Sequence, residues 1–302
     1  MIAPWQLALV RQATIARVPF ADALRRLKRR VSGYRPNASN IGSTLYDLRQ
    51  LHNLMRANEL RFRGAVLEIG SGWFPIAGIV ARLAGADRVI LTDIIPHMDQ
   101  QTFLTSRQIV LEQLDEIAKA FDFDPQTARG TLIGAATPKE LKLTYMAPFD
   151  ITAVPDASLD LVMSRACLEH IPAPDLEALA ARLRTKLKRG GFMAHAIDNS
   201  DHFSHVDPRL SRVNFLTWSD AKHHLIWSLA RGGENRLRHH EYADLFRRNG
   251  YEVIASDAFI DAKVLQGLSR LKLVAPYNRM TAKQIAAVTS WYVLRTSTSQ
   301  LL

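Results

Sequence analysis

The chain has 302 residues, 47% of them hydrophobic and 23% charged, which is ordinary usage for a globular protein with a sizeable core. Its single cysteine, Cys167, excludes an intrachain disulfide framework and is typical of a reducing compartment. No run of about 18 apolar residues predicts a membrane-spanning helix. Because Arg11 and Arg17 interrupt the apolar start, we expect no cleaved secretory signal and a cytoplasmic protein.

The net charge of +10 is concentrated at the start of the chain. Residues 1–63 hold 12 of the 39 Lys and Arg but only three acidic residues, and "ALRRLKRR" (Ala23 to Arg30) is their densest run. One interpretation is peripheral contact of residues 1–35 with an anionic membrane at its inner face. The other is a solvated helix face beside the core.

Residues 1–63 are predicted to form a helical cap. "PWQLALVRQATIARV" has helical apolar spacing, and a second helix is expected over "STLYDLRQLHNLMRANEL", with Ser43 or Thr44 as its N-cap. The polar stretch "RPNASNIGS" between them predicts a break.

From Gly64 onward, short β-rich runs alternate with helical runs. Strands are expected over "AVLEIG", "RVILTDI", "LDLVMSRA" and "GFMAHAID", helices over "PIAGIVARLAG", 98–121 and "DLEALAARLRTKL". This alternation predicts an α/β domain over 64–302, with a doubly wound, mostly parallel sheet. Residues 199–237 break the rhythm and are expected to form a lid. A helix over "HHEYADLFRRNG" and strands over "YEVIASDAFI" and "SWYVLRTS" follow.

A glycine turn follows the first predicted strand, in "VLEIGSGWFP". Gly70 and Gly72 remove side chains where an open parallel sheet binds ligands, beyond the carboxyl ends of its strands. Asp93 ends the next strand, where a carboxylate can accept both hydroxyls of a ribose; alternatively it caps a helix. Pro75 occupies the last position of a G-x-G-x-x-G pattern, so the dinucleotide fingerprint fails.

Four motifs in order resemble those of class I S-adenosylmethionine-dependent methyltransferases. They are "VLEIGSG", "VILTDI", "FDITAVPDASLDLVMSRACLEHIPAPD" and "LKRGGFM", the last with Arg189 in the usual proline position. The resemblance covers about 64–298 and implies a seven-stranded Rossmann-like sheet with S-adenosyl-L-methionine as cofactor. A looser similarity, in "APWQLALVRQATIARVPF" and "DHFSHVDPRLSRVNFLTWSD", is to a bacterial polysaccharide and natural-product subgroup.

The resemblance implies roles for eight cofactor-binding residues. Glu68, Gly70 and Gly72 would line the amino-acid end of the cofactor. Asp93 would hold the ribose, Ile94 would pack on the adenine and Asp150 would meet its amino group. Ser164 and Arg165 would lie under the sulfonium. Trp73 and Phe74 depart from the family pattern; we expect them to pack on the N-terminal helices rather than narrow the cofactor mouth.

The chemistry also requires a group that takes a proton from a hydroxyl acceptor. His202 and His205, in "DNSDHFSHVDP", and His170, in "LEHIP", are the candidates for this base. The same acidic and histidine-rich loop could instead be a metal site or a hydrogen-bonded structural loop, and no metal ligand is assigned. His195 is expected to be a core histidine. An anionic or sugar-like acceptor is expected to bind to Arg209, Arg212, Arg231, Arg236 and Arg238, with Trp218 and Trp227. Alternatively, these tryptophans pack the lid onto the body.

We therefore expect methyl transfer to a small-molecule acceptor, with a hydroxyl of a sugar, lipid-linked glycan or secondary metabolite preferred. The alternatives are an N-methyltransferase and an inactive methyltransferase fold that acts as a binding module. A nicotinamide-dependent oxidoreductase is disfavoured by Pro75. A nucleic-acid methyltransferase is disfavoured because no [DN]-P-P-[YFW] motif is present, so no nucleic-acid partner is expected.

Overall fold

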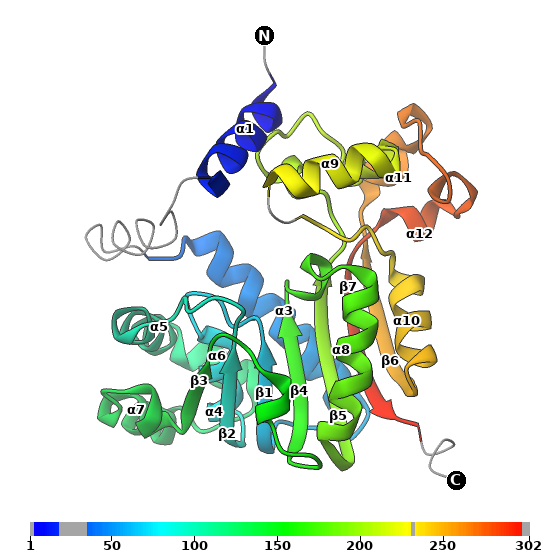
Figure 1. Cartoon of the computed structure of the whole chain (residues 1–302). Coiled ribbons are helices and arrows are strands. Elements are labelled where there is room, and N and C mark those ends of the chain that lie inside the picture. The colour runs from blue at the N-terminus through cyan, green and yellow to red at the C-terminus, as the bar shows by residue number, and fades with distance from the viewer. Residues whose placement is uncertain (1–2, 18–34, 231–232, 298–302) are drawn as a thin grey trace.

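Seven strands form one sheet in the computed structural model, which describes residues 3–17, 35–230 and 233–297 (Figure 1). The strand order is β3-β2-β1-β4-β5-β7-β6. The strands are β1 (Gly64–Ile69), β2 (Ala86–Thr92), β3 (Leu143–Met146), β4 (Leu159–Arg165), β5 (Leu187–Asp198), β6 (Tyr251–Ile260) and β7 (Ala287–Thr296). β1 to β5 pair in parallel, whereas β7 runs antiparallel to both of its neighbours. The predicted mostly parallel seven-stranded sheet is confirmed.

The sequence of β1 explains its central position in the sheet. Five of its six residues are buried. Val66 packs with one layer of helices and the neighbouring Leu67 with the other, because successive side chains of a strand point to opposite faces. A strand covered on both faces therefore needs apolar residues at nearly every position.

Helices cover both faces of this sheet. On the front face in Figure 1 lie α8 (Ala173–Lys186) and α10 (His239–Arg248). The opposite face packs against α3 (Ala38–Ala57) and α4 (Ile76–Leu83). The same apolar layer continues through α5 (Gln100–Glu112), α6 (Leu114–Phe121) and α7 (Pro125–Gly134).

Three local predictions differ from the structure. The expected N-cap of α3 is wrong, because the helix begins at Ala38 and the side chain of Asn37 accepts the capping hydrogen bond. The hydroxyls of Ser43 and Thr44 donate to the carbonyl of Asn40 within the helix instead. The region 98–121 forms two helices that meet at Gln113, and neither the short β3 nor α7 was predicted.

An upper lobe lies beyond the carboxyl ends of the parallel strands (Figure 1). We define it as α1 (Pro4–Arg17), the described part of 199–237 with α9 (Asp220–Ala230), and 261–286 with α11 (Ala262–Gly267) and α12 (Ala282–Ala286). Its apolar cluster includes Phe203, Trp218 and Tyr277. The ring of Trp5 in α1 lies 5.7 Å from Phe203 and 6.0 Å from Trp218. Thus α1 packs on the rest of the upper lobe, whereas α3 packs on the sheet.

The basic run from Ala23 to Arg30 lies outside the described residues, so membrane contact through residues 1–35 stays a prediction. Within the ranges that the structure describes, no helix combines the length and the apolar character needed to cross a membrane.

Candidate active site

The glycine turn after β1 lies where the strand order of the sheet reverses. Gly70 and Gly72 have φ of +74° and +65°, a region that favours glycine. A Cβ on Gly70 would lie 2.4 Å from the Cys167 sulfur, whereas a Cβ on Gly72 would meet no atom within 4 Å. The amides of Gly70 and Ser71 both donate to the carbonyl of Thr92. The turn is therefore fixed to β2 and leaves open space above Gly72.

Asp93 lies directly beside this turn. Its Oδ2 accepts a hydrogen bond from the Gly72 amide at 3.0 Å, and its Oδ1 lies 4.0 Å from Nε2 of His97. The Trp73 ring stacks on His97 with centroids 4.8 Å apart. Trp73 therefore lies at the mouth of the predicted ribose site, and its packing on the N-terminal segment stays a prediction because residues 18–34 lie outside the described residues. Phe74 does pack against the apolar cluster that α3 shares.

Glu68 places a buried carboxylate beneath the turn. Burial raises its pKa to about 7, although hydrogen bonds from Ser71 and from the Gly78 backbone oppose the shift. Among the described residues its Oε2 has no hydrogen-bond partner. A Cβ on Gly78 would lie 3.0 Å from that oxygen, so glycine in α4 leaves room for the acid.

Two further predicted contacts continue along the same edge of the sheet. Ile94 follows Asp93 and is 78% exposed, which leaves its side chain available for an apolar ring. Asp150 is exposed, and its side chain caps a short 3-10 helix (Ile151–Ala153) by accepting from the Thr152 amide. The amide of Phe149 donates to the Asp93 carbonyl, which joins this loop to the tip of β2. The carboxylates, the exposed Ile94 and the open space above Gly72 fit an adenosyl cofactor, although these contacts stay predictions.

Ser164, at the end of β4, has a partner inside the core. Its hydroxyl lies 2.8 Å from Nδ1 of His195, and both side chains are buried. Burial lowers the pKa of His195 to about 3, so this imidazole is neutral, as expected for a core histidine. A contact of Ser164 with the cofactor stays a prediction.

Arg165 fastens α3 to the tip of β4. Its guanidinium lies 3.0 Å from Asp47 and donates to the hydroxyl of Ser43 at 2.8 Å. Asp47 also accepts from the indole of Trp291 in β7. Burial raises the pKa of Asp47, although the charge of Arg165 opposes the shift. Arg165, the side chain expected under the sulfonium, therefore binds to Asp47 and Ser43 of α3.

A cavity of about 270 Å³ lies between the upper lobe and the turn that follows β4. Its aromatic walls come from Phe203, Trp218 and Trp227. Its polar lining comes from the turn after β4 and from the upper lobe, including α1. The polar residues are Gln12, His170, His202, His223 and Glu234.

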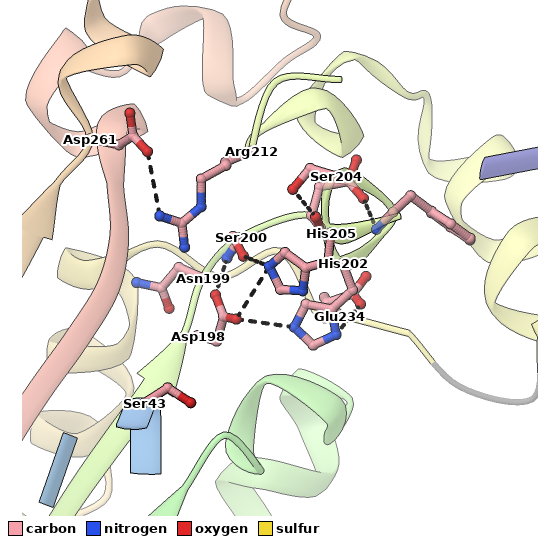
Figure 2. Close-up of polar contacts among 12 residues, drawn as sticks. Ser43, Asp198, Asn199, Ser200, His202, Ser204, His205, Arg212, Glu234 and Asp261 are labelled. Carbon is pink, nitrogen blue, oxygen red and sulfur yellow. Dashed lines mark hydrogen bonds and ion pairs between the residues drawn. The ribbon is translucent and has the colours of Figure 1, made fainter. Parts of the chain in front are cut away.

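His202 is held between two carboxylates. Its Nδ1 lies 2.8 Å from Glu234 and its Nε2 3.4 Å from Asp198, and Figure 2 shows Asp198 facing both His202 and His205. Burial alone would lower the pKa of His202, but Asp198 and Glu234 outweigh it and raise the pKa to about 10. His202 is therefore charged at neutral pH and holds no free lone pair for a proton.

His170 and His205 are the neutral members of the cluster. Nδ1 of His170 donates to the carbonyl of Gly233 at 2.9 Å, because a carbonyl can only accept. This bond places the lone pair of His170 on Nε2. Burial lowers the pKa of both imidazoles, and the charge on His202 lowers them further.

The structure adds Glu169, which the sequence analysis did not single out. Its carboxyl is 1% exposed, and burial, followed by the charge of Asp198, raises its pKa to about 8. The only sequence signal is an acid inside the otherwise apolar run "ACLEHIP".

The arginines expected to bind an anionic acceptor are engaged elsewhere. Arg236 donates to the Trp218 carbonyl and to Asp220, and Arg238 is buried against three backbone carbonyls. Two others pair with acids, Arg209 with Asp207 and Arg212 with Asp261. Arg231 lies outside the described residues. None of the described residues that line the cavity is Lys or Arg, and contact of these arginines with an acceptor stays a prediction.

Comparison with known proteins assigns the family. Residues 43–256, more than half of the chain, match a family described as methyltransferase domain. The chain is similar to magnesium protoporphyrin IX methyltransferase from Synechocystis PCC 6803 with bound SAH (TM-score 0.50, 15% identity, covering 95% of this chain and 100% of that one). It is also similar to an S-adenosylmethionine dependent methyltransferase from Mesorhizobium loti (TM-score 0.42, 15% identity, covering 76% and 90%). A search of curated proteins finds no match. The chain belongs to the methyltransferase domain family and has the fold of class I S-adenosylmethionine-dependent methyltransferases.

Proposed function

We propose that this methyltransferase uses S-adenosyl-L-methionine to methylate a hydroxyl group of a small, uncharged acceptor. A sugar, a lipid-linked glycan or a secondary metabolite would fit. The observation that carries the proposal is the short turn after β4, which joins the predicted cofactor site to the cavity. Cys167 contacts the position of Gly70 in the glycine turn, and His170, three residues later, lines the cavity. An acceptor in the cavity would therefore lie next to a cofactor at the strand tips.

Four residues support the cofactor assignment. Asp93 would accept hydrogen bonds from the ribose, Ile94 would cover the adenine, and the free space above Gly72 would admit the adenosyl group. The free oxygen of Glu68 would attract the ammonium. When bound, the cofactor supplies an electrophilic methyl group whose leaving group is a neutral thioether. The protein then has to align the acceptor and remove its proton.

The lining of the cavity supports an uncharged acceptor. Phe203, Trp218 and Trp227 offer aromatic faces of the kind that pack on sugar or aromatic rings. The acid Glu234 and the absence of Lys and Arg among the described lining residues disfavour a phosphate or a carboxylate at the reacting end.

The neutral imidazoles supply the proton acceptor. His170 lines the cavity with Nε2 available, and His205 stacks on His202, with its own Nε2 3.2 Å from the Ser200 hydroxyl. General base catalysis of this kind contributes about 10²- to 10⁴-fold to a rate. The charged His202 would orient the acceptor rather than accept its proton.

The test is transfer of a labelled methyl group from S-adenosylmethionine to a panel of uncharged hydroxyl compounds and matched amines. We expect labelled ethers, and we expect His170→Asn to lower kcat about 10²- to 10⁴-fold without changing cofactor affinity. His224→Asn, on the exposed face of α9, should leave both unchanged. Labelled amines, or cofactor binding with no transfer to any compound class, would contradict the proposal.

A further inference from the structure

Three side chains with ligand atoms meet at one wall of the acceptor cavity. One ligand atom each from Glu169, His170 and His202 lies within 4.8 Å of the other two. Ligands of one tetrahedral zinc lie about 3.4 Å apart, as its bond lengths of about 2.1 Å require. Side-chain rotations that shorten the separations by up to about 1.4 Å would bring all three atoms onto a single ion.

Glu169 is the observation that points to a ligand. Its side chain is 1% exposed, and neither carboxylate oxygen has a hydrogen-bond partner among the described residues. A buried carboxyl group without partners is unfavourable, and its ionised form costs several kcal/mol in the general case, so burial holds Glu169 in its protonated form unless a cation compensates. Nε2 of His202 lies 3.4 Å from Asp198 as an ion pair but makes no hydrogen bond among the described residues. Both residues belong to the same cluster, so one cation would give each of them a partner.

One ring nitrogen of each histidine is held by an oxygen, which is the arrangement seen around protein-bound metals. Nδ1 of His170 donates to the Gly233 carbonyl at 2.9 Å, and Nδ1 of His202 is held by Glu234 at 2.8 Å. A carbonyl or carboxylate on one ring nitrogen orients the ring and directs the other nitrogen to the metal. On His202 the ion would have to displace the proton of Nε2, because only a neutral imidazole binds a metal. Asp198 lies 3.4 Å from Nε2 of His202 but outside this cluster of three, so a fourth position would stay open.

We propose that Glu169, His170 and His202 bind one transition-metal dication, with zinc as the reference ion, at the wall of the acceptor cavity. Two imidazoles and one carboxylate suit zinc, cobalt or iron better than magnesium or calcium, which prefer all-oxygen sites. The set also matches the two-His, one-Glu donor type of catalytic zinc sites, which keep a position open. This inference departs from the sequence analysis, which assigned no metal ligand.

The role of the ion rests on the proposed function. An acceptor hydroxyl in the open position would lose its proton more readily, because a bound dication lowers the pKa of its ligands. His170 would then act as a ligand, and His205 would take the proton. The acceptor oxygen forms its bond to the methyl carbon as the bond from that carbon to sulfur breaks, so the charge of the sulfonium is lost with the thioether.

The primary test measures metal binding without any acceptor. The full chain is stripped with a chelator and titrated with zinc against a chromogenic competitor, and cobalt provides an absorption spectrum that reports the ligands. We expect one zinc per chain with a Kd near or below about 1 µM. Glu234→Gln should weaken it about 10- to 100-fold, and Glu169→Gln and His202→Asn at least as much. His224→Asn, exposed on α9, is the matched control and should bind as the wild type.

Circular dichroism and thermal unfolding of the metal-free variants separate lost ligands from lost folding, and His170→Asn replaces any variant that fails to fold. Less than one equivalent of zinc, or wild-type affinity in all folded ligand variants, would overturn the site. Wild-type methyl transfer by the fully stripped protein would overturn the role in catalysis. Titration with the cofactor separates the two proposals. A wild-type chain that binds S-adenosylmethionine but no zinc would refute only the metal site. A wild-type chain that binds zinc but no S-adenosylmethionine would refute the proposed function.

Discussion

The Gly72 amide donates to the Asp93 carboxylate at 3.0 Å and so joins the tips of β1 and β2. Gly72 makes this bond with φ of +65° and leaves open space where a side chain would stand. Within the proposed function, that space belongs to the cofactor. The bond thus links the backbone conformation of the turn to the acid that would hold the ribose.

Gly72→Ala should therefore lower both stability and cofactor affinity. A Cβ at this φ costs about 1–2 kcal/mol of backbone strain. Gly190 is a matched control, since it has φ of +79° and equally open surroundings but lies at the opposite end of β5. Urea unfolding should show similar losses for Gly72→Ala and Gly190→Ala, whereas calorimetry should show weaker cofactor binding only for the first. Equal cofactor affinity in both variants would place the cofactor elsewhere.

The ion pair between Arg165 and Asp47 should stabilise the docking of α3. Both side chains are mostly buried, and Asp47→Asn leaves the guanidinium without its charge partner. We expect the free energy of unfolding to fall by about 2 kcal/mol, below the range for a fully buried pair. The exposed pair of Arg247 and Asp244 is the control, and Asp244→Asn should change stability by less than about 0.5 kcal/mol. Urea denaturation measures both; equal effects would show that the Arg165 pair adds nothing beyond a surface contact.

His195 should make stability depend on acid pH. Its folded pKa of about 3 lies below the ordinary value of 6.5, so the unfolded chain binds an extra proton between these values. The free energy of unfolding should decrease as the pH falls from 6.5 towards 3, by up to about 1.4 kcal/mol per pH unit from this group. His195→Gln should remove that part of the slope in urea unfolding at pH 6.5, 5.5 and 4.5. An unchanged slope would mean that His195 is protonated in the folded protein.

Arg238 should contribute strongly to stability by connecting the upper lobe to the sheet. It is fully buried and donates to the carbonyls of Asn199, Ile285 and Ala287. Arg238→Met leaves these acceptors unsatisfied, at about 1–3 kcal/mol for each group that finds no water, and we expect a total loss of about 3–5 kcal/mol. Arg209→Met, at a mostly exposed arginine, should cost far less. Thermal unfolding compares the two, and similar losses would refute the role of Arg238.

Regular patterns in the sequence predicted the sheet well. Runs such as "AVLEIG" and "GFMAHAID" are mostly apolar at successive positions, and that pattern is typical of strands covered on both faces. By contrast, β3 has only four residues, of which Leu143 alone is buried, so it leaves little signal. The N-cap of α3 was missed because Asn37 lies in a polar stretch that is also typical of a loop.

The electrostatics of the site could not be predicted in the same way. His202 is charged because Glu234, 32 positions later, lies against its ring, and Arg238 is structural because Ile285 and Ala287 accept its hydrogen bonds. Such pairs depend on how the upper lobe folds over the strand ends, which local sequence patterns do not encode. The glycine turn and Asp93 were predictable because their spacing is short and set by two adjacent strands.

The most direct test of the account is calorimetric titration of the purified protein with S-adenosylmethionine and its demethylated thioether product. We predict saturable binding of one equivalent, weakened at least about tenfold, or about 1.4 kcal/mol, by Asp93→Ala. Asp87→Ala, at the exposed opposite end of β2, should bind as the wild type. Absence of binding by the wild type, or an undiminished affinity in Asp93→Ala, would contradict a cofactor site at the tips of β1 and β2.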